Sequence, residues 1–208
     1  VLEGLSIEKM GAIRNMAYAS ATKVLLHCRE RFWQSKYKIF AGGSTSDNIQ
    51  RQTFYPMDQA EFRPRHDGPK HHSQYSHMTY ANVGRKKGED DRAPGVLIGA
   101  YAWGRDSRRL GALGENDRAE VVMDHIERFH PEIREYVTDT ATIDWEAEKY
   151  SAGAFAFLRP GQLEHVFPHA GTPEGRLFFA GEHCSTDQAW VQGSMISALQ
   201  AVDDIVKS

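Results

Sequence analysis

A glycine, a glutamate and a tryptophan stand close together near the end of the chain, in LFFAGEHCSTDQAWVQGSMISALQAVDDIV, Leu177 to Val206. Gly181 lets another group approach the backbone closely, and Glu182 follows it directly. A helix is predicted to start near Trp190, and its first turn would carry free N–H groups and a positive dipole end. Such a helix start suits a negative charge. Periodicity alone, however, favours a strand, loop and helix that bind nothing.

Apolar spacing defines the elements that would position these residues. LFFA reads as the end of a strand, and the helix after Trp190 is predicted to turn one apolar stripe toward a core. That stripe comprises Val191, Met195, Ala198, Val202 and Ile205.

The rest of the chain alternates irregularly between helical and strand patterns. Helices are predicted over 6–19, with Ser6 as N-cap, and over 115–129. Strands are predicted over 21–28, 51–56, 95–104 and 137–145, and a turn over 42–47. The polar segment 57–94 reads as a long surface loop. This order predicts a mixed α and β (α+β) fold.

Composition limits the classes of partner. The chain has 208 residues, a formal net charge of −3 and no basic stripe, which argues against nucleic acid or an anionic membrane. No apolar run approaches the roughly 20 residues of a membrane span. Two cysteines are too few for a disulfide framework. A soluble chain is expected; the start lacks a signal-peptide pattern, so the compartment and the question of secretion stay open.

Three other groups of residues could carry chemistry, and each has a simpler interpretation. His66, His71, His72 and His77 match no closed zinc pattern, so a solvated histidine-rich loop is favoured. His183 and Cys184 are adjacent on a loop and have no evident third partner for nucleophilic catalysis. The acidic residues of helix 115–129 are typical of a solvated face.

Five blocks in order resemble FAD-dependent L-amino-acid oxidases of the flavin amine oxidase superfamily. They are ATKVLLHCRERFW, GGSTSDNIQRQTFYP, GVLIGAYAWG, DWEAEKYSAGAFAFLRPGQ and FFAGEHCS with AWVQGSMISALQA. The similarity covers most of the chain apart from 57–94. It implies a partial two-domain flavoprotein, with 1–19 ending an FAD-domain segment, 20–170 forming a substrate domain with a mixed sheet, and 171–208 supplying the last strand and helix of a Rossmann-like FAD domain.

The resemblance also implies roles for individual residues. Lys23 matches a lysine that holds a water against flavin N5, where desolvation would suit it to proton or oxygen chemistry. Tyr101 matches a tyrosine whose hydroxyl binds the substrate α-carboxylate, and Trp145 a tryptophan beside the isoalloxazine. Trp103 is interpreted as packing.

At the C-terminal segment, Ala189 and Trp190 match the small residue and tryptophan beside the substrate amine and side chain. Glu182 matches a glutamate that hydrogen-bonds FAD. Phe54 and Tyr55 occupy a paired-aromatic position, in which Tyr55 is a candidate substrate contact and the Phe departs from the family's Tyr. The implied cofactor contacts are Lys23, Trp145, Gly181, Glu182, Ala189, Trp190 and Val191.

No G-x-G-x-x-G occurs, although the family carries one near its start to cradle the ADP half of FAD. The chain is therefore expected to be a processed or truncated C-terminal part that needs N-terminal chains of the same enzyme, as a homodimer or a hetero-oligomer. The implied reaction converts an L-amino acid, water and oxygen to a 2-oxo acid, ammonia and hydrogen peroxide. The alternatives are a primary amine or polyamine oxidase, which needs no carboxylate clamp, and a catalytically silent flavoprotein scaffold.

Overall fold

The computed structural model describes residues 4–64 and 80–208, which form two compact units. Unit 1 contains the described residues up to Ala21 together with Trp145–Ser208, and unit 2 contains Thr22–Asp144. The combination of helices with antiparallel sheets is the mixed α and β fold that the sequence predicts.

A five-stranded sheet of order β3-β4-β7-β2-β8 forms the centre of unit 2. Strand β2 pairs antiparallel with β8, so that Lys23 lies opposite Ile143. The elements of this unit are β2 (Ala21–Cys28), α2 (Phe32–Ser35), β3 (Gly42–Thr45), β4 (Gln52–Tyr55), β5 (Ala60–Pro64), β6 (Tyr80–Arg85), β7 (Gly95–Trp103), α3 (Gly104–Gly111), α4 (Glu115–Ile126), α5 (Ile133–Tyr136) and β8 (Val137–Asp144).

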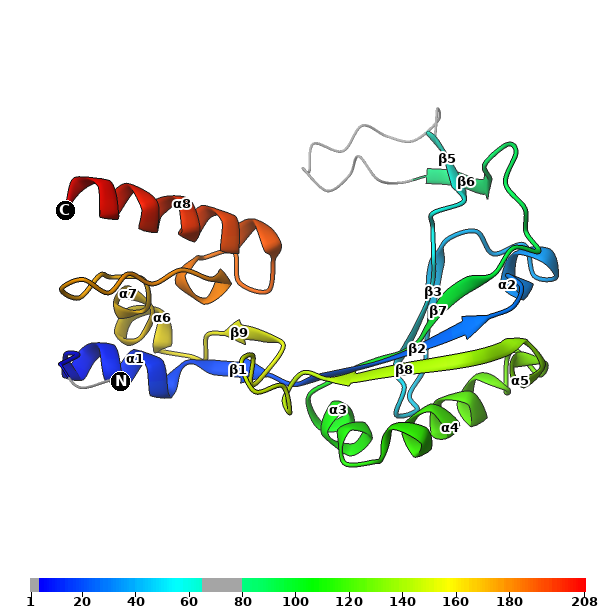
Figure 1. Ribbon diagram of the computed structural model, residues 1–208, viewed down its shortest axis with the longest axis horizontal. Coiled ribbons are helices and arrows are strands. Elements are labelled where there is room, and N and C mark those ends of the chain that lie inside the picture. The colour runs from blue at the N-terminus through cyan, green and yellow to red at the C-terminus, as the bar shows by residue number, and fades with distance from the viewer. Residues whose placement is uncertain (1–3, 65–79) are drawn as a thin grey trace. The chain divides into compact units, whose positions relative to one another are not determined.

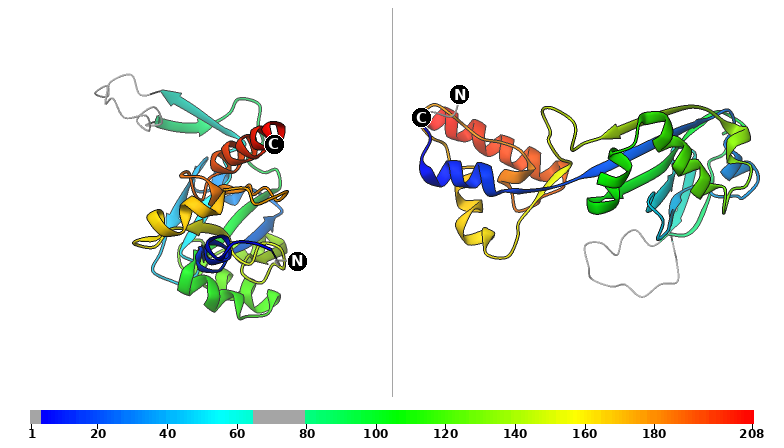
Figure 2. Two further views of the ribbon diagram at one scale, coloured as in Figure 1. Left: turned by 90° about the vertical axis from the view of Figure 1, so that its left-hand side faces the viewer. Right: turned by 90° about the horizontal axis from the view of Figure 1, so that it is seen from below.

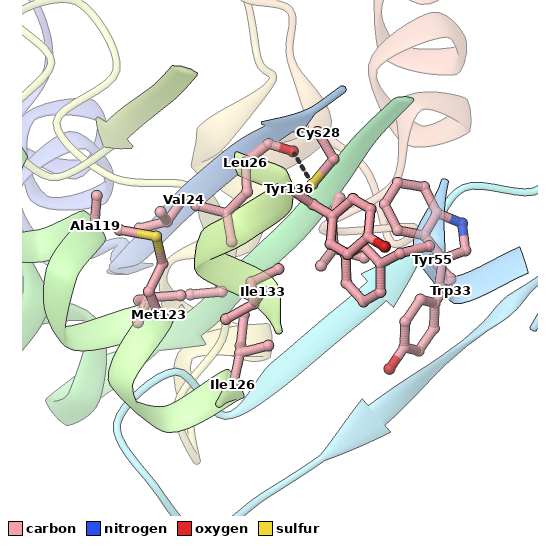
Figure 3. Packing of buried hydrophobic residues seen from close by; sticks show 14 of the residues in the cluster. Val24, Leu26, Cys28, Trp33, Tyr55, Ala119, Met123, Ile126, Ile133 and Tyr136 are labelled. Carbon is pink, nitrogen blue, oxygen red and sulfur yellow. Dashed lines mark hydrogen bonds between the residues drawn. The ribbon is translucent and has the colours of Figure 1, made fainter. Parts of the chain in front are cut away.

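Helices α3 and α4 lie on the same face of this sheet (Figures 1 and 2). Val24 and Leu26 of β2 are completely buried and point toward Met123 and Ile126 of α4 (Figure 3). Alternation along β2 explains this burial, because every second side chain of a strand faces the helices. The predicted apolar stripe of helix 115–129 is confirmed as the side of α4 that builds the core.

The opposite face of the sheet carries Lys23, Phe54, Ile98 and Tyr101, all partly exposed; we call it the Lys23 face. Along strand β7 the alternation of buried and partly exposed side chains shifts by one residue, since Gly99 and Ala100 are buried in succession. Such a one-residue shift is typical of a β-bulge, which re-aims a side chain. Tyr101 consequently lies on the Lys23 face, with the buried Ala100 and Ala102 on either side of it in the chain.

Unit 1 contains short elements and one long helix. They are α1 (Ile7–Asn15), β1 (Ala17–Ala19), β9 (Phe155–Phe157), α6 (Gln162–His165), α7 (Phe167–Ala170), η2 (Glu182–Cys184) and α8 (Val191–Lys207). Strands β1 and β9 pair antiparallel. Segment 171–181 runs between α1 and α8 (Figures 1 and 2). Lys9 of α1 is 1% exposed and donates to the Ala170 carbonyl at 3.0 Å, which joins α1 to α7.

Unit 1 does not bury the predicted apolar face of α8. The side chains expected to face a core are exposed instead: Val191, Met195, Ala198, Val202 and Ile205. The buried residues of this helix are Gly193 and Ser197, one turn apart. Loop 181–187 lies close against α8 at these two positions, and only small residues allow that approach.

Four further predictions need correction. Helix 6–19 ends at Asn15, and Ala17–Ala19 pairs as β1, although Ser6 is confirmed as the N-cap. The segment predicted as a turn, 42–47, contains β3, since Gly42–Thr45 pairs with β4. Leu177–Ala180 forms no strand: among the described residues only Leu177 has a ladder partner, in an isolated bridge to Glu174.

The fourth correction concerns 57–94, which is not a continuous loop. Strands β5 and β6 pair antiparallel within it, with Ala60 opposite Arg85. Residues 65–79, which include His66, His71, His72 and His77, lie outside the described part of the chain.

A buried histidine should make the stability of unit 2 depend on pH. His130 is 2% exposed, its Nε2 lies 2.7 Å from the Tyr55 hydroxyl, and burial lowers its pKa. As the pH falls, the His130 ring is therefore protonated at a higher pH in the unfolded chain than in the folded one. Folding stability is consequently lost as the pH falls below the unfolded pKa of about 6.5. We expect the urea midpoint of the complete enzyme to decrease as the pH is lowered from about 7.5 to about 5, and to decrease less steeply in His130→Phe. Equal slopes in the two proteins would contradict this assignment.

Candidate functional site

Lys23 stands on β2 with its ammonium over an aromatic ring. Its Nζ lies 4.5 Å from the centroid of the Tyr101 ring on the neighbouring strand β7. Among the described residues, no carboxylate forms an ion pair with this ammonium. The predicted pair of Lys23 and Tyr101 is thus brought together, and it presents an uncompensated positive charge beside a phenol.

Aromatic side chains surround Tyr101. The Trp103 ring meets it edge-on at 5.2 Å between centroids, and Phe54 lies at 6.3 Å. Phe54 is therefore the member of the predicted aromatic pair on the Lys23 face. Tyr55 points the other way into the core, where it is 6% exposed and its hydroxyl lies 2.7 Å from His130 Nε2.

In unit 1, Glu182 organises the loop before α8. Its Oε1 accepts a hydrogen bond of 2.8 Å from the Ala156 N–H of β9, and its Oε2 accepts one of 2.8 Å from the Ala189 N–H. Each bond joins a charged acceptor to a backbone donor, which makes it stronger than a neutral pair. A carboxylate has about four lone-pair sites, so two further donors can still be accommodated. The contact between Glu182 and FAD stays a prediction.

The backbone around Glu182 depends on glycine. Gly181 has φ +146°, and a Cβ there would stand 2.3 Å from the His183 ring. Its N–H donates to Ser197 Oγ at 2.9 Å, while the Ser197 hydroxyl lies 2.8 Å from the Gly181 carbonyl. Sequence reasoning missed Ser197. The sequence does carry a signal for it: Gly193 and Ser197 are small residues four positions apart, and therefore on one face, of an otherwise apolar helix.

Helix α8 begins with unsatisfied donors. Ala189 adopts φ +65°, Trp190 is the N-cap without a side-chain hydrogen bond, and the helix proper starts at Val191. Among the described residues, none accepts a hydrogen bond from the N–H of Val191 or Gln192. The Nε2 of Gln188, just upstream, is buried and likewise lacks an acceptor. These donors and the helix dipole suit an acceptor-rich, electron-rich ring.

Trp190 and Trp145 offer flat surfaces in unit 1. Trp190 is 69% exposed at the start of α8. Trp145 is half-buried, and its backbone N–H donates to the Ala21 carbonyl at 3.0 Å. The cofactor contacts proposed for both rings stay predictions.

His183 and Cys184 show no sign of an activated nucleophile. Burial raises the pKa of the Cys184 thiol to about 11, and burial lowers the pKa of His183. At neutral pH both groups are therefore uncharged. Nearby, Tyr18 has its pKa raised to about 12, chiefly by burial and also by Glu182. Tyr18 and His183 border a largely apolar cavity of about 360 Å³ beside α1.

Two features are absent from the part of the chain that the structure describes. No group of three or more His, Cys, Asp or Glu side chains within 4–64 and 80–208 could hold a metal ion. No described helix has the length and apolar character needed to cross a bilayer.

The chain is similar to flavin-dependent oxidases. The family described as flavin containing amine oxidoreductase matches residues 1–206. The chain is 35% identical to the flavin-dependent L-tryptophan oxidase RebO of Lentzea aerocolonigenes over 97% of its length and 37% of that protein. It is 32% identical to the L-amino-acid oxidase of Siganus canaliculatus over 98% of its length and 33% of that protein. It therefore spans about a third of these relatives.

A solved structure shares the fold. Cyclohexylamine oxidase from Brevibacterium oxydans IH-35A aligns with a TM-score of 0.68 and 15% identity, over 98% of this chain and 38% of that one. The match to a flavin family and to flavin-dependent relatives identifies the cofactor as FAD. The start of α8, with its unsatisfied donors, fits such a group. The chain belongs to the flavin containing amine oxidoreductase family.

Proposed function

We propose that this chain forms the C-terminal part of an L-amino-acid oxidase. The reaction consumes an L-amino acid, water and oxygen and yields a 2-oxo acid, ammonia and hydrogen peroxide. The observation that carries the proposal is the meeting of Lys23 and Tyr101 on one partly exposed face of the sheet. Relatives named as an L-tryptophan oxidase and an L-amino-acid oxidase support the substrate class.

Each residue has a defined task in this proposal. The Tyr101 hydroxyl donates to the α-carboxylate; Phe54 offers a flat surface in unit 2, and Trp190 offers one in unit 1. The substrate binds with a neutral amine, and bound FAD supplies the redox chemistry by taking the hydride from Cα. Ala189 leaves room beside the substrate amine. The N–H groups of Val191 and Gln192, with Glu182 behind them, hold the electron-rich end of the cofactor.

We also propose that an N-terminal chain or segment of the same enzyme covers α8. The helix exposes apolar side chains along its length, among them Val191 at 77%, Leu199 at 71% and Val206 at 78%. An exposed apolar stripe of this kind marks an interaction surface. The partner is the part that carries the dinucleotide fingerprint, and the assembly is a homodimer or a hetero-oligomer of processed chains. Expression of 1–208 alone should give a colourless protein, and a yellow, cooperatively melting monomer would contradict this proposal.

A substrate panel tests the reaction class. The complete enzyme is assayed for peroxide with L-amino acids and with the amines that their decarboxylation would give. We expect turnover with one or more amino acids and little with the matching amines. Preference for the amines would support a primary amine or polyamine oxidase instead. Absence of both peroxide and anaerobic flavin bleaching would indicate a catalytically silent scaffold.

Removing the Tyr101 hydroxyl should weaken amino-acid binding specifically. A hydrogen bond to a charged group contributes about 1.5–3 kcal/mol, so Tyr101→Phe should lower kcat/KM for amino acids by about 10- to 100-fold. The effect should fall mainly on KM, because the carboxylate is bound equally in ground and transition states. The decarboxylated amine is the control substrate, whose kcat/KM should stay unchanged. Equal losses for both substrates would remove the carboxylate role.

A further inference from the structure

We propose that Tyr101 has a second role, in which its ring positions the Lys23 ammonium on the Lys23 face without neutralising the charge. The inference deepens the proposed function and rests on it: Lys23, which the resemblance places beside flavin N5, is taken to serve the reaction of the reduced flavin with oxygen. Tyr101 is a positioning residue in this role, since it acts through Lys23.

Strands β2 and β7 are neighbours in the sheet, and they place the Tyr101 ring beside the Lys23 ammonium. Lys23 has a flexible four-carbon stem, and its partner across β8 is Ile143, which offers no hydrogen-bond acceptor on its side chain. On the other side, β7 places the Tyr101 ring 4.5 Å from Nζ, within the range of a cation–π contact. The ring itself is held by Trp103 at 5.2 Å and Phe54 at 6.3 Å.

A π face attracts an ammonium group without cancelling its positive charge, whereas a carboxylate cancels it. Arg134, elsewhere in unit 2, contacts Glu120, Asp124 and Glu127, and these three anions cancel its charge. The Lys23 ammonium meets no carboxylate among the described residues, and a neutral ring orients a cation through its quadrupole. The described residues therefore hold the Lys23 ammonium against a ring without an anion to cancel its charge, which suits it to stabilise negative charge on dioxygen.

The contact itself can be tested by NMR without any turnover. The complete protein is reductively methylated with ¹³C, and the Lys23 signal is assigned by its loss in Lys23→Met. The ring should move the Lys23 methyl signals upfield of the lysines that have no ring beneath them, both with and without FAD; Lys9, Lys36 and Lys149 also lie over rings and are left out of that reference set. Tyr101→Phe keeps the ring and should keep this shift, whereas Tyr101→Leu should lose it. A wild-type Lys23 signal at the position of lysines without a ring contact would overturn the inference even if Tyr101→Leu does not fold.

Stopped-flow reoxidation separates this inference from the proposed function. In photoreduced enzyme free of amino acid, where the Tyr101 hydroxyl has no carboxylate to bind, we expect the rate constant for the reaction with oxygen to fall about fivefold in Tyr101→Leu and to stay near wild type in Tyr101→Phe. Equal rate constants in the two variants would overturn the positioning role. A Lys23→Met enzyme that reoxidises normally would instead overturn the proposed role of the lysine, whatever the NMR signals show.

Discussion

Gly193→Ala will remove bound flavin from the complete enzyme and lower its melting temperature. A Cβ at this position would stand 2.2 Å from the carbonyl oxygen of Asp187 and 3.2 Å from Ser185 Oγ. The first contact is with backbone, so no side-chain rotation can relieve it. Helix α8 must then move away from loop 181–187, and the unsatisfied N–H groups of Val191 and Gln192 move with it.

The size of the effect follows from overpacking. Forcing a methyl group into a filled site typically costs about 1–3 kcal/mol, and a collision with backbone belongs at the upper end of that range. We expect a loss of about 3 kcal/mol in the free energy of unfolding, measured by urea titration, and little yellow colour after purification. Helix propensity alone would favour alanine over glycine, so the predicted loss of stability is opposite in sign to the change that helix propensity would give.

Gly171→Ala is the matched control in the same unit. A Cβ there meets Cys184 Cβ at 3.5 Å, which is ordinary van der Waals contact. This variant should retain flavin and stability close to wild type. If Gly193→Ala also retained both, the close seating of α8 on its loop would not hold the cofactor site together.

Strong local patterns were enough to predict part of this fold. Strand 21–28 matches β2 because its β-branched and apolar residues alternate across a half-buried sheet. Helix 115–129 corresponds to α4, since its apolar stripe is wide enough to form the core of unit 2. The start of α8 at Val191 also agrees, because the change of period after Trp190 is abrupt.

Other features depend on contacts that are distant in sequence. Hydrophobic periodicity identified an apolar stripe on α8, yet the face buried in unit 1 is the one with Gly193 and Ser197, because loop 181–187 requires small neighbours. The segment 42–47 reads as a turn from its glycines, but pairing with β4 overrides that local preference. Likewise, the choice between Phe54 and Tyr55 for the Lys23 face depends on the register Phe54 opposite Ile98, which no local pattern encodes.

Lys23→Met should slow the reaction of the reduced enzyme with oxygen far more than it slows reduction by the amino acid. Methionine keeps the length and apolar stem of lysine but removes the charge. Two unit charges 4 Å apart interact by about 4 kcal/mol at an effective dielectric constant of 20, so a fixed ammonium can strongly favour negative charge on dioxygen. Because no described carboxylate compensates this ammonium, nearly all of that field is lost on substitution.

The expected decrease in the oxygen rate constant is about 100-fold or more, comparable with the loss of one preorganised donor at a developing anion. Stopped-flow mixing of photoreduced enzyme with oxygen measures this step, and anaerobic mixing with substrate measures flavin reduction, which should change by less than tenfold. Lys36→Met is the control, because Lys36 also lies over a tyrosine ring, at 5.1 Å from the Tyr136 centroid, but has Glu132 at 3.3 Å to compensate its charge. If both lysine variants reoxidised at the wild-type rate, charge at position 23 would have no part in oxygen activation, and Tyr101 alone would define the chemistry of this face.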